Sequence, residues 1–171
     1  MFLKILIGLA VLIVGFCMYA ATRPDTFRYT RSLAIAAPTE TLFGYINDPR
    51  KFQEWNPFVQ DDPANKITFS GPESGIDAAC EWSGGKSGEG TMTVVQSEPA
   101  SLVRYRMDFR KPFQATHTAE FTLKPEDGKT IVSWSLYGDN TFIGKAMSVF
   151  IDCDKMCGDQ FVKGLTNLKT L

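Results

Sequence analysis

The sequence lacks the features by which several functional classes are recognised. It contains one histidine and four cysteines, and its formal net charge is −1 at pH 7. A charge so close to zero gives no electrostatic reason to expect a nucleic-acid partner. One histidine without a nucleophile-elbow motif does not support a Ser/His/Asp site. We therefore expect neither nucleic-acid binding nor serine-hydrolase chemistry.

The cysteines form neither a disulfide framework nor a metal-binding pattern. Cys153 and Cys157 are one helical turn apart, a spacing that seldom has disulfide geometry. Together with Cys80 and His117 they could supply four metal ligands, but the spacing is not that of a known zinc site. The sequence therefore predicts no metal ion and no other cofactor.

What the sequence does contain is one long uncharged run. Residues 5–22 carry no charge, and Lys4 precedes them. As a helix that rises roughly 1.5 Å per residue, this run is about 27 Å long, close to the thickness of a bilayer core. We expect residues 1–22 to form a single-pass transmembrane anchor, residues 23–25 a linker and residues 26–171 one domain. A cleaved signal peptide is the alternative, although Tyr19 suits a cleavage site poorly.

The charges that flank this run indicate its orientation. Arg23, Arg28 and Arg31 follow the run closely, whereas Lys4 and the terminal amine precede it. Because positively charged flanks tend to stay in the cytoplasm, this arrangement favours a cytoplasmic domain over one on the opposite face.

The domain alternates turn residues with short apolar patterns, which predicts an α+β fold. Strict alternation over residues 26–36 predicts a first strand. Pro38 suits the start of a helix that ends near residue 47, and a second short helix is expected over residues 49–55. Apolar residues at three-, four- and seven-residue spacing predict one long amphipathic helix over residues 142–171. Between these helices, short turns predict six antiparallel strands, at residues 66–70, 78–83, 88–97, 102–110, 113–124 and 130–139.

This order of elements resembles the START-like or SRPBCC superfamily, whose members share the helix-grip fold. Residues 31–38 are similar to the family's opening strand and helix start, residues 52–57 to its tryptophan-rich loop, and residues 158–169 to the close of its C-terminal helix. The chain is most similar to the polyketide cyclase/dehydrase branch, whose members often carry an N-terminal membrane span. The resemblance implies a seven-stranded antiparallel curved sheet around the long C-terminal helix, with a hydrophobic cavity between them.

Large side chains of one parity along the expected strands are candidates for ligand contacts. Methionine gives adaptable apolar contacts, whereas tyrosine and tryptophan place a polar group in an apolar wall. The same side chains could instead fill a solid core. Trp55 and Phe58, after the short helices, could form a lid over the cavity, cap the core or touch the bilayer. The strand residues that we expect to bind ligand are Trp82, Met92, Tyr105, Met107 and Trp134.

His117, Phe150 and Asp154 are the remaining candidates for ligand binding. His117 shares its parity with apolar residues, so it could bond to a ligand carbonyl, act as a general base or serve a structural role. Phe150 and Asp154 lie on the apolar stripe of the expected last helix. Burying an unpaired carboxylate is costly, so Asp154 should bind a ligand hydroxyl, pair with His117 or lie at the solvent boundary.

Three functions are compatible with these observations. The first is a membrane-anchored module that binds an apolar small molecule or lipid in a cavity between the sheet and the C-terminal helix. The second is a cavity enzyme of the polyketide cyclase/dehydrase type, with His117 as the candidate catalytic residue. The third is a membrane-tethered, non-catalytic interaction protein. Members of the resembling family bind or transport lipids and polyketides and only some catalyse, which favours the first; the oligomeric state is not determined by the sequence.

Overall fold

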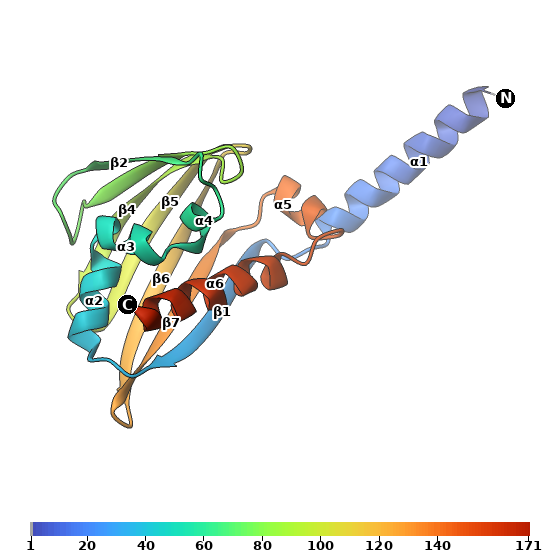
Figure 1. Ribbon diagram of the computed structural model, residues 1–171. Helices are drawn as coiled ribbons and strands as arrows, with labels where there is room; N and C mark the ends of the chain where they lie inside the picture. The colour runs from blue at the N-terminus through green and yellow to red at the C-terminus, as the bar shows by residue number, and fades with distance from the viewer. Residues whose placement is uncertain (1) are drawn as a thin grey trace.

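The computed structural model describes residues 2–171, which form a curved antiparallel sheet, a helix along its concave face and a separate N-terminal helix (Figure 1). The sheet has seven strands in the order β1-β7-β6-β5-β4-β3-β2. This confirms the predicted α+β helix-grip architecture. The strands are β1 (Thr26–Ile35), β2 (Lys66–Ser70), β3 (Ala79–Ser83), β4 (Glu89–Glu98), β5 (Leu102–Lys111), β6 (Ala115–Glu126) and β7 (Lys129–Asp139).

Six helices complete the described residues. The long α6 lies across the concave face of the sheet, and three short helices close the side of the sheet between β1 and β2 (Figure 1). The N-terminal helix α1 extends away from the domain and is long and apolar enough to cross a membrane, although a signal sequence would also meet that description. The helices are α1 (Phe2–Ala21), α2 (Thr39–Asn47), α3 (Pro49–Trp55), α4 (Pro57–Gln60), α5 (Phe142–Met147) and α6 (Cys153–Thr170).

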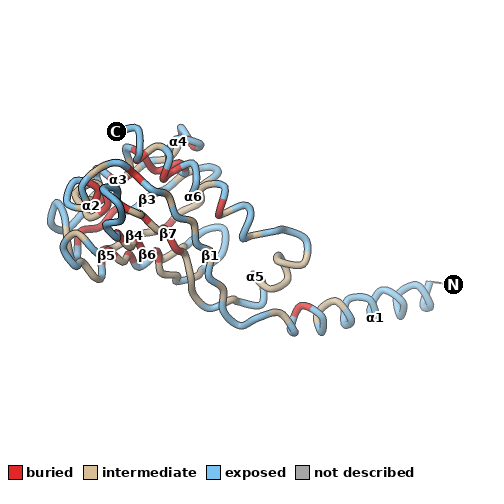
Figure 2. Tube along the Cα trace, turned by 90° about the horizontal axis from the view of Figure 1, so that it is seen from below, coloured by how far each residue is buried: buried red, intermediate tan, exposed pale blue. Residues whose placement is uncertain are grey.

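The two faces of the sheet have different chemistry because side chains alternate along each strand. On the convex face, the hydroxyl groups of Thr30 and Ser135 lie 2.8 Å apart, and those of Ser32 and Ser133 lie 2.7 Å apart. The opposite face carries the apolar side chains, and buried residues gather between it and the helices (Figure 2). The apolar core of the domain therefore lies on the concave side.

An aromatic cluster joins α6 to the sheet. The ring of Trp134 on β7 stacks on Phe161 of α6, with the ring centroids 4.5 Å apart. Gly164 permits this approach, since a Cβ atom at that position would lie 2.7 Å from the Trp134 ring and 3.0 Å from Pro57. α6 can therefore pack closely on both β7 and α4 because residue 164 has no side chain.

The prediction of one continuous helix over residues 142–171 is wrong. The structure has α5 at Phe142–Met147 and α6 at Cys153–Thr170, with a break between them. Asp152 takes a non-helical conformation, and its side chain accepts a hydrogen bond of 2.9 Å from the backbone N–H of Lys155. This is an N-cap, which starts a new helix. The sequence did not indicate this break, because the helical spacing of apolar residues continues across it.

Glu120 is a buried charge on the convex face that should make stability depend on pH. Burial alone would raise its pKa, but hydrogen bonds from Arg104 Nε (2.6 Å), Arg28 Nη1 (3.3 Å) and Tyr137 Oη (3.1 Å) hold the pKa of the folded protein below 4.5. Because the pKa of Glu120 is lower in the folded state than in the unfolded state, its ionised form stabilises the fold. This contribution is fully present at pH values above the pKa of Glu120 in the unfolded chain. This contribution is lost as the pH falls through the pKa of the folded state.

Glu120→Gln is therefore expected to lower the free energy of unfolding by about 1–2 kcal/mol at neutral pH. Urea unfolding of the two proteins should give this difference at pH 7, and the difference should shrink as the pH falls through the lowered pKa of the native carboxylate. A difference that stays constant over this range would show that the charge of Glu120 is not its source.

Candidate functional site

The concave interior is closed at one end and open at the end from which α1 emerges. β1 begins directly after α1, and its first residues pair with the last residues of β7. The register of β7, β6 and β5 places the C-terminal end of β5 at this same end of the sheet. Along β5, Val103 and Tyr105 are fully buried, whereas Met107 and Phe109 nearer this edge are only partly buried. The neighbouring strands β6 and β7 show the same gradient. The interior is thus not a uniformly filled core.

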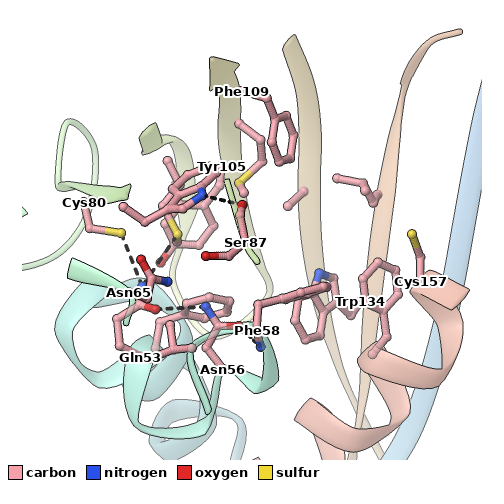
Figure 3. Close-up of a pocket in the computed structure, with 18 of the residues that line it drawn as sticks. Gln53, Asn56, Phe58, Asn65, Cys80, Ser87, Tyr105, Phe109, Trp134 and Cys157 are labelled. Carbon is pink, nitrogen blue, oxygen red and sulfur yellow. Dashed lines mark hydrogen bonds between the residues drawn. The ribbon is translucent and has the colours of Figure 1, made fainter. Parts of the chain in front are cut away.

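A cavity of about 330 Å³ occupies this opening (Figure 3). Its volume lies within the range of roughly 300–1,000 Å³ that is typical of small-molecule sites. Among the residues that line it, only Lys86 carries a charge, and its side chain is at the exposed rim. The lining residues are Phe52, Gln53, Asn56, Phe58, Val59, Asn65, Cys80, Trp82, Lys86, Ser87, Met92, Tyr105, Met107, Phe109, Ala119, Phe121, Trp134, Leu136, Cys157 and Phe161.

The rim of the cavity is fastened by Asp62, which follows α4. Its Oδ2 atom accepts hydrogen bonds from the backbone N–H groups of Lys86 (2.8 Å) and Ser87 (2.9 Å) and from the Ser87 hydroxyl (2.9 Å). These bonds hold the pKa of the Asp62 carboxyl below its usual value. A Cβ atom on Gly84 would lie 2.4 Å from Asp62 Oδ2, so glycine is needed for this approach. The turn between β3 and β4 is therefore fixed against α4.

A chain of amide groups crosses one wall of the cavity. The backbone N–H of Phe58 donates to Asn56 Oδ1 (3.1 Å), and Asn56 Nδ2 donates to Gln53 Oε1 (2.9 Å). Gln53 Nε2 then donates to the sulfur atoms of Cys80 (3.3 Å) and Met92 (3.8 Å) (Figure 3). Because a backbone N–H can only donate, it fixes the orientation of both amides. The N–H₂ group of Gln53 must therefore face the sulfur-lined part of the cavity.

This amide donor is poorly matched by its present partners. Thiol and thioether sulfur atoms are weak hydrogen-bond acceptors compared with oxygen. The carboxamide oxygen of Asn65, also on the cavity lining, is buried without a hydrogen-bond partner among the described residues. The cavity thus presents one donor, Gln53 Nε2, that a bound oxygen atom could satisfy better than the two sulfur atoms do.

The ionisable groups inside the cavity are held in their neutral forms. Burial raises the pKa of the Cys80 thiol to about 12 and that of Cys157 to about 11. Burial also raises the pKa of Tyr105 well above its usual value, and its hydroxyl donates to the backbone carbonyl of Ile46. At neutral pH these groups remain protonated, so none is poised as a base or nucleophile. The lining is suited to bind a neutral molecule.

Six of the ten residues predicted to bind ligand line this cavity. They come from β3, β4, β5, β7 and α4, and they are Phe58, Trp82, Met92, Tyr105, Met107 and Trp134. Trp55 lies behind the lining, fully buried against Phe121 and Trp134. Phe58 remains 41% exposed at the rim, the position expected of a lid residue. The ligand-binding role of these side chains is a prediction that the geometry accommodates.

The structure does not bring His117, Phe150 and Asp154 together. His117 lies beyond the cavity lining, between the rings of Phe27 (centroids 4.8 Å apart) and Phe109 (5.6 Å). Burial lowers its pKa despite an opposing hydrogen bond with the backbone of Asp139. Phe150 is 78% exposed because it falls in the break before α6.

Of the three roles considered for Asp154, the structure shows the position at the solvent boundary and not a pairing with His117. Asp154 instead accepts hydrogen bonds from the guanidinium of Arg31 on β1, at 3.0 and 3.1 Å. Because α6 begins only at Cys153, Asp154 is in its first turn and lies exposed over β1. The Arg31 guanidinium also fills the space beside Gly158, where a Cβ atom would lie 2.1 Å from Nη2. This ion pair fastens α6 to β1.

Sequence reasoning missed the polar residues of the cavity, Gln53, Asn56 and Asn65. One signal was present, because Asn56-Pro57 has the form of an N-cap followed by proline at the first helical position. That signal predicts α4 and fixes the Asn56 side chain. No comparable pattern marks Gln53, which reaches the cavity because α3 packs on β3.

Comparison with known proteins identifies the fold of this domain. The family model described as polyketide cyclase/dehydrase and lipid transport matches residues 26–171. No functionally curated protein matches the sequence.

Solved structures with the same fold come from several organisms. A protein of Thermobifida fusca is 20% identical with a TM-score of 0.62, covering 83% of this chain and 90% of the other. Aha1 from Colwellia psychrerythraea is 14% identical with a TM-score of 0.59, covering 84% and 93%. Major latex-like protein 151 from Panax ginseng is 10% identical with a TM-score of 0.58, covering 86% and 97%. Identities this low show a shared fold and no more.

Proposed function

Because the chain belongs to the polyketide cyclase/dehydrase and lipid transport family, we propose that it is a membrane-anchored module that binds a neutral, largely apolar molecule in the cavity beneath α6. The observation that carries this proposal is an apolar cavity of about 330 Å³ with a fixed amide donor in its wall. α1 would hold the domain at a membrane, where apolar molecules dissolve.

The lining indicates the class of ligand. Apolar contacts supply about 25 cal/mol per Å² of buried surface, and few polar groups are needed to set orientation. Since none of the described lining residues places a carboxylate or ammonium inside the rim, a charged group would be buried without a partner, which is costly. An oxygen atom that accepts from Gln53 Nε2 would replace two weak sulfur contacts. A hydroxyl group supplies such an oxygen without carrying a charge, so we favour a ligand with a hydroxyl group.

Native mass spectrometry of residues 26–171 tests this proposal directly. The family match spans this segment without α1, so we expect it to fold on its own, and it is purified from cells without detergent. We expect a defined apolar molecule to remain bound, and extraction under denaturing conditions to identify it. A segment that is isolated empty, and that binds neither fatty alcohols nor alkanes on titration, would refute the proposal.

Gln53→Leu should reveal the polar contact. We expect this change to weaken binding of a fatty alcohol roughly tenfold, since a net hydrogen bond contributes about 1–1.5 kcal/mol. Binding of the alkane of equal length should be unchanged. Displacement of a neutral environment-sensitive dye measures both affinities.

Gln114→Leu is the matched control, because Gln114 is exposed outside the cavity. It should leave both affinities at the wild-type level. If Gln53→Leu weakened the alcohol and the alkane equally, the change would be acting on the shape of the cavity and not through its hydrogen bond.

A further inference from the structure

α5 and the residues that follow it expose an unusual amount of apolar surface. Phe142 and Ile143 are 51% and 46% exposed, and Phe150, in the break before α6, is 78% exposed. Met147 and Ile151 are also exposed. These side chains belong to one segment, residues 142–151, which we call the α5 platform. An exposed apolar surface on a single segment is typical of a binding face.

The α5 platform continues the surface of α1. The two helices pack together, and Figure 1 shows α5 beside the C-terminal end of α1. The ring of Phe150 stacks on Phe16, with the centroids 5.4 Å apart and the planes inclined by 26°. α1 lies beside the platform, and the described residues of α1 are exposed along most of the helix (Figure 2).

The position of the Phe16–Phe150 contact along α1 indicates how far this contact lies from the polar end of the helix. Phe16 lies about 8 Å before the end of α1 at Ala21, at a rise of roughly 1.5 Å per residue. Tyr19 and Arg23, whose guanidinium lies 5.3 Å from the Tyr19 ring centroid, mark the polar end of the helix, as aromatic and basic residues do at membrane surfaces. Phe150 is therefore level with the apolar part of α1, and not with its polar end.

Polar contacts secure the platform at this level. Lys145, the charged residue of α5, is ion-paired with Asp25 and is largely buried. Asn140 binds the connection after α1 through its backbone N–H to Asp25 O (2.7 Å) and through Nδ2 to Pro24 O (3.1 Å). The platform is thus held against α1 at a fixed height, with its charge turned inward and its apolar side chains outward.

We propose that the α5 platform is seated in the lipid bilayer beside α1, so that Phe150 reaches the acyl chains. This proposal rests on the proposed anchoring of α1, and it adds that the domain itself touches lipid. α6 begins directly after the platform, and its Cys157 lines the cavity. The open end of the cavity would therefore face the bilayer, which makes membrane-dissolved alcohols and lipids the source of ligand.

Quenching of tryptophan fluorescence by brominated phosphatidylcholine tests this proposal in the full chain. Three single variants are reconstituted in phosphatidylcholine vesicles: Phe150→Trp on the platform, Leu12→Trp in the middle of α1 and Ile76→Trp between β2 and β3. All three positions are exposed, and the changes disturb no core residue. The signal of the parent protein, with its three tryptophans, is subtracted.

We expect bromine to quench Phe150→Trp and Leu12→Trp by at least half and to leave Ile76→Trp unaffected. Bromine close to the headgroups should quench Phe150→Trp more than bromine deep in the chains, and the reverse should hold for Leu12→Trp. If Leu12→Trp is quenched but Phe150→Trp is not, the platform inference fails and the anchor stands. If neither is quenched, both the anchor and the platform are refuted.

Discussion

Replacing Ala119 with phenylalanine should lower ligand affinity roughly 100-fold with little effect on folding. Ala119 lies on β6 at the floor of the cavity, paired in register with Tyr105 and Leu136. A phenyl ring at this position would occupy space that the ligand needs. Excluding about four methylene-sized groups, at about 0.8 kcal/mol each, removes about 3 kcal/mol of binding energy. Dye displacement by a fatty alcohol on residues 26–171 measures the change.

Thr118→Phe is the matched control for this substitution. Thr118 is the preceding residue on the same strand, and its side chain projects from the convex face, which none of the described helices covers (Figure 1). It adds a ring of the same size outside the cavity and should bind the alcohol with wild-type affinity. Equal loss of affinity in both variants would show that ligands do not occupy the cavity beneath α6.

Trp134→Ala should be the most destabilising single change in the domain. The Trp134 ring is 4% exposed, and it packs on Phe161, on Phe121 (centroids 5.0 Å apart) and on Trp55 (5.7 Å). Its removal would separate α6 and α3 from β7 and leave a cavity that the rigid sheet cannot close. We expect a loss of about 3–5 kcal/mol in the free energy of unfolding. In urea the midpoint should fall by about 2 M.

Phe58→Ala provides the comparison, since Phe58 is also an aromatic residue of the cavity lining. Its ring is 41% exposed and lies 6.5 Å from Trp134, centroid to centroid. We expect this change to cost less than about 1 kcal/mol. If the two substitutions proved equally destabilising, the aromatic cluster around Trp134 would not be the main packing interaction between α6 and the sheet.

The architecture could be predicted from the sequence because apolar and polar residues alternate along the strands with a period of two. Alternation placed β2 at its observed bounds and β1 within one residue, and α3 begins and ends as predicted at Pro49 and Trp55. The short turns between successive strands then predicted antiparallel pairing, because parallel neighbours need a long crossover connection. Side-chain parity is a local property, which is why the inward position of Met107 and Trp134 followed from the strands alone.

The details of the site depend on distances that no local pattern carries. Gln53 reaches the cavity because α3 packs on β3, and a chain of hydrogen bonds that starts at the Phe58 backbone orients its amide. His117 has the parity of the cavity residues but lies nearer the open edge, beyond the lining. Phe150 has the right helical spacing, yet the N-cap at Asp152 removes it from the helix that faces the sheet. The parity of a residue specifies the face of the sheet on which its side chain lies. Its position along the strand decides whether that side chain lies in the filled core, in the cavity or beyond the cavity at the open end.

The connection between α1 and β1 limits how the domain can work. Residues 22–25 span at most about 14 Å even when fully extended, and hydrogen bonds from Asn140 already hold Pro24 and Asp25 in place. A carrier that shuttles cargo between two membranes needs a tether long enough to cross the aqueous gap. On the proposed anchoring of α1 in a bilayer, this domain would instead act as a stationary receptor. Its cargo would leave only by returning to the same membrane or by passing to a partner that comes to it.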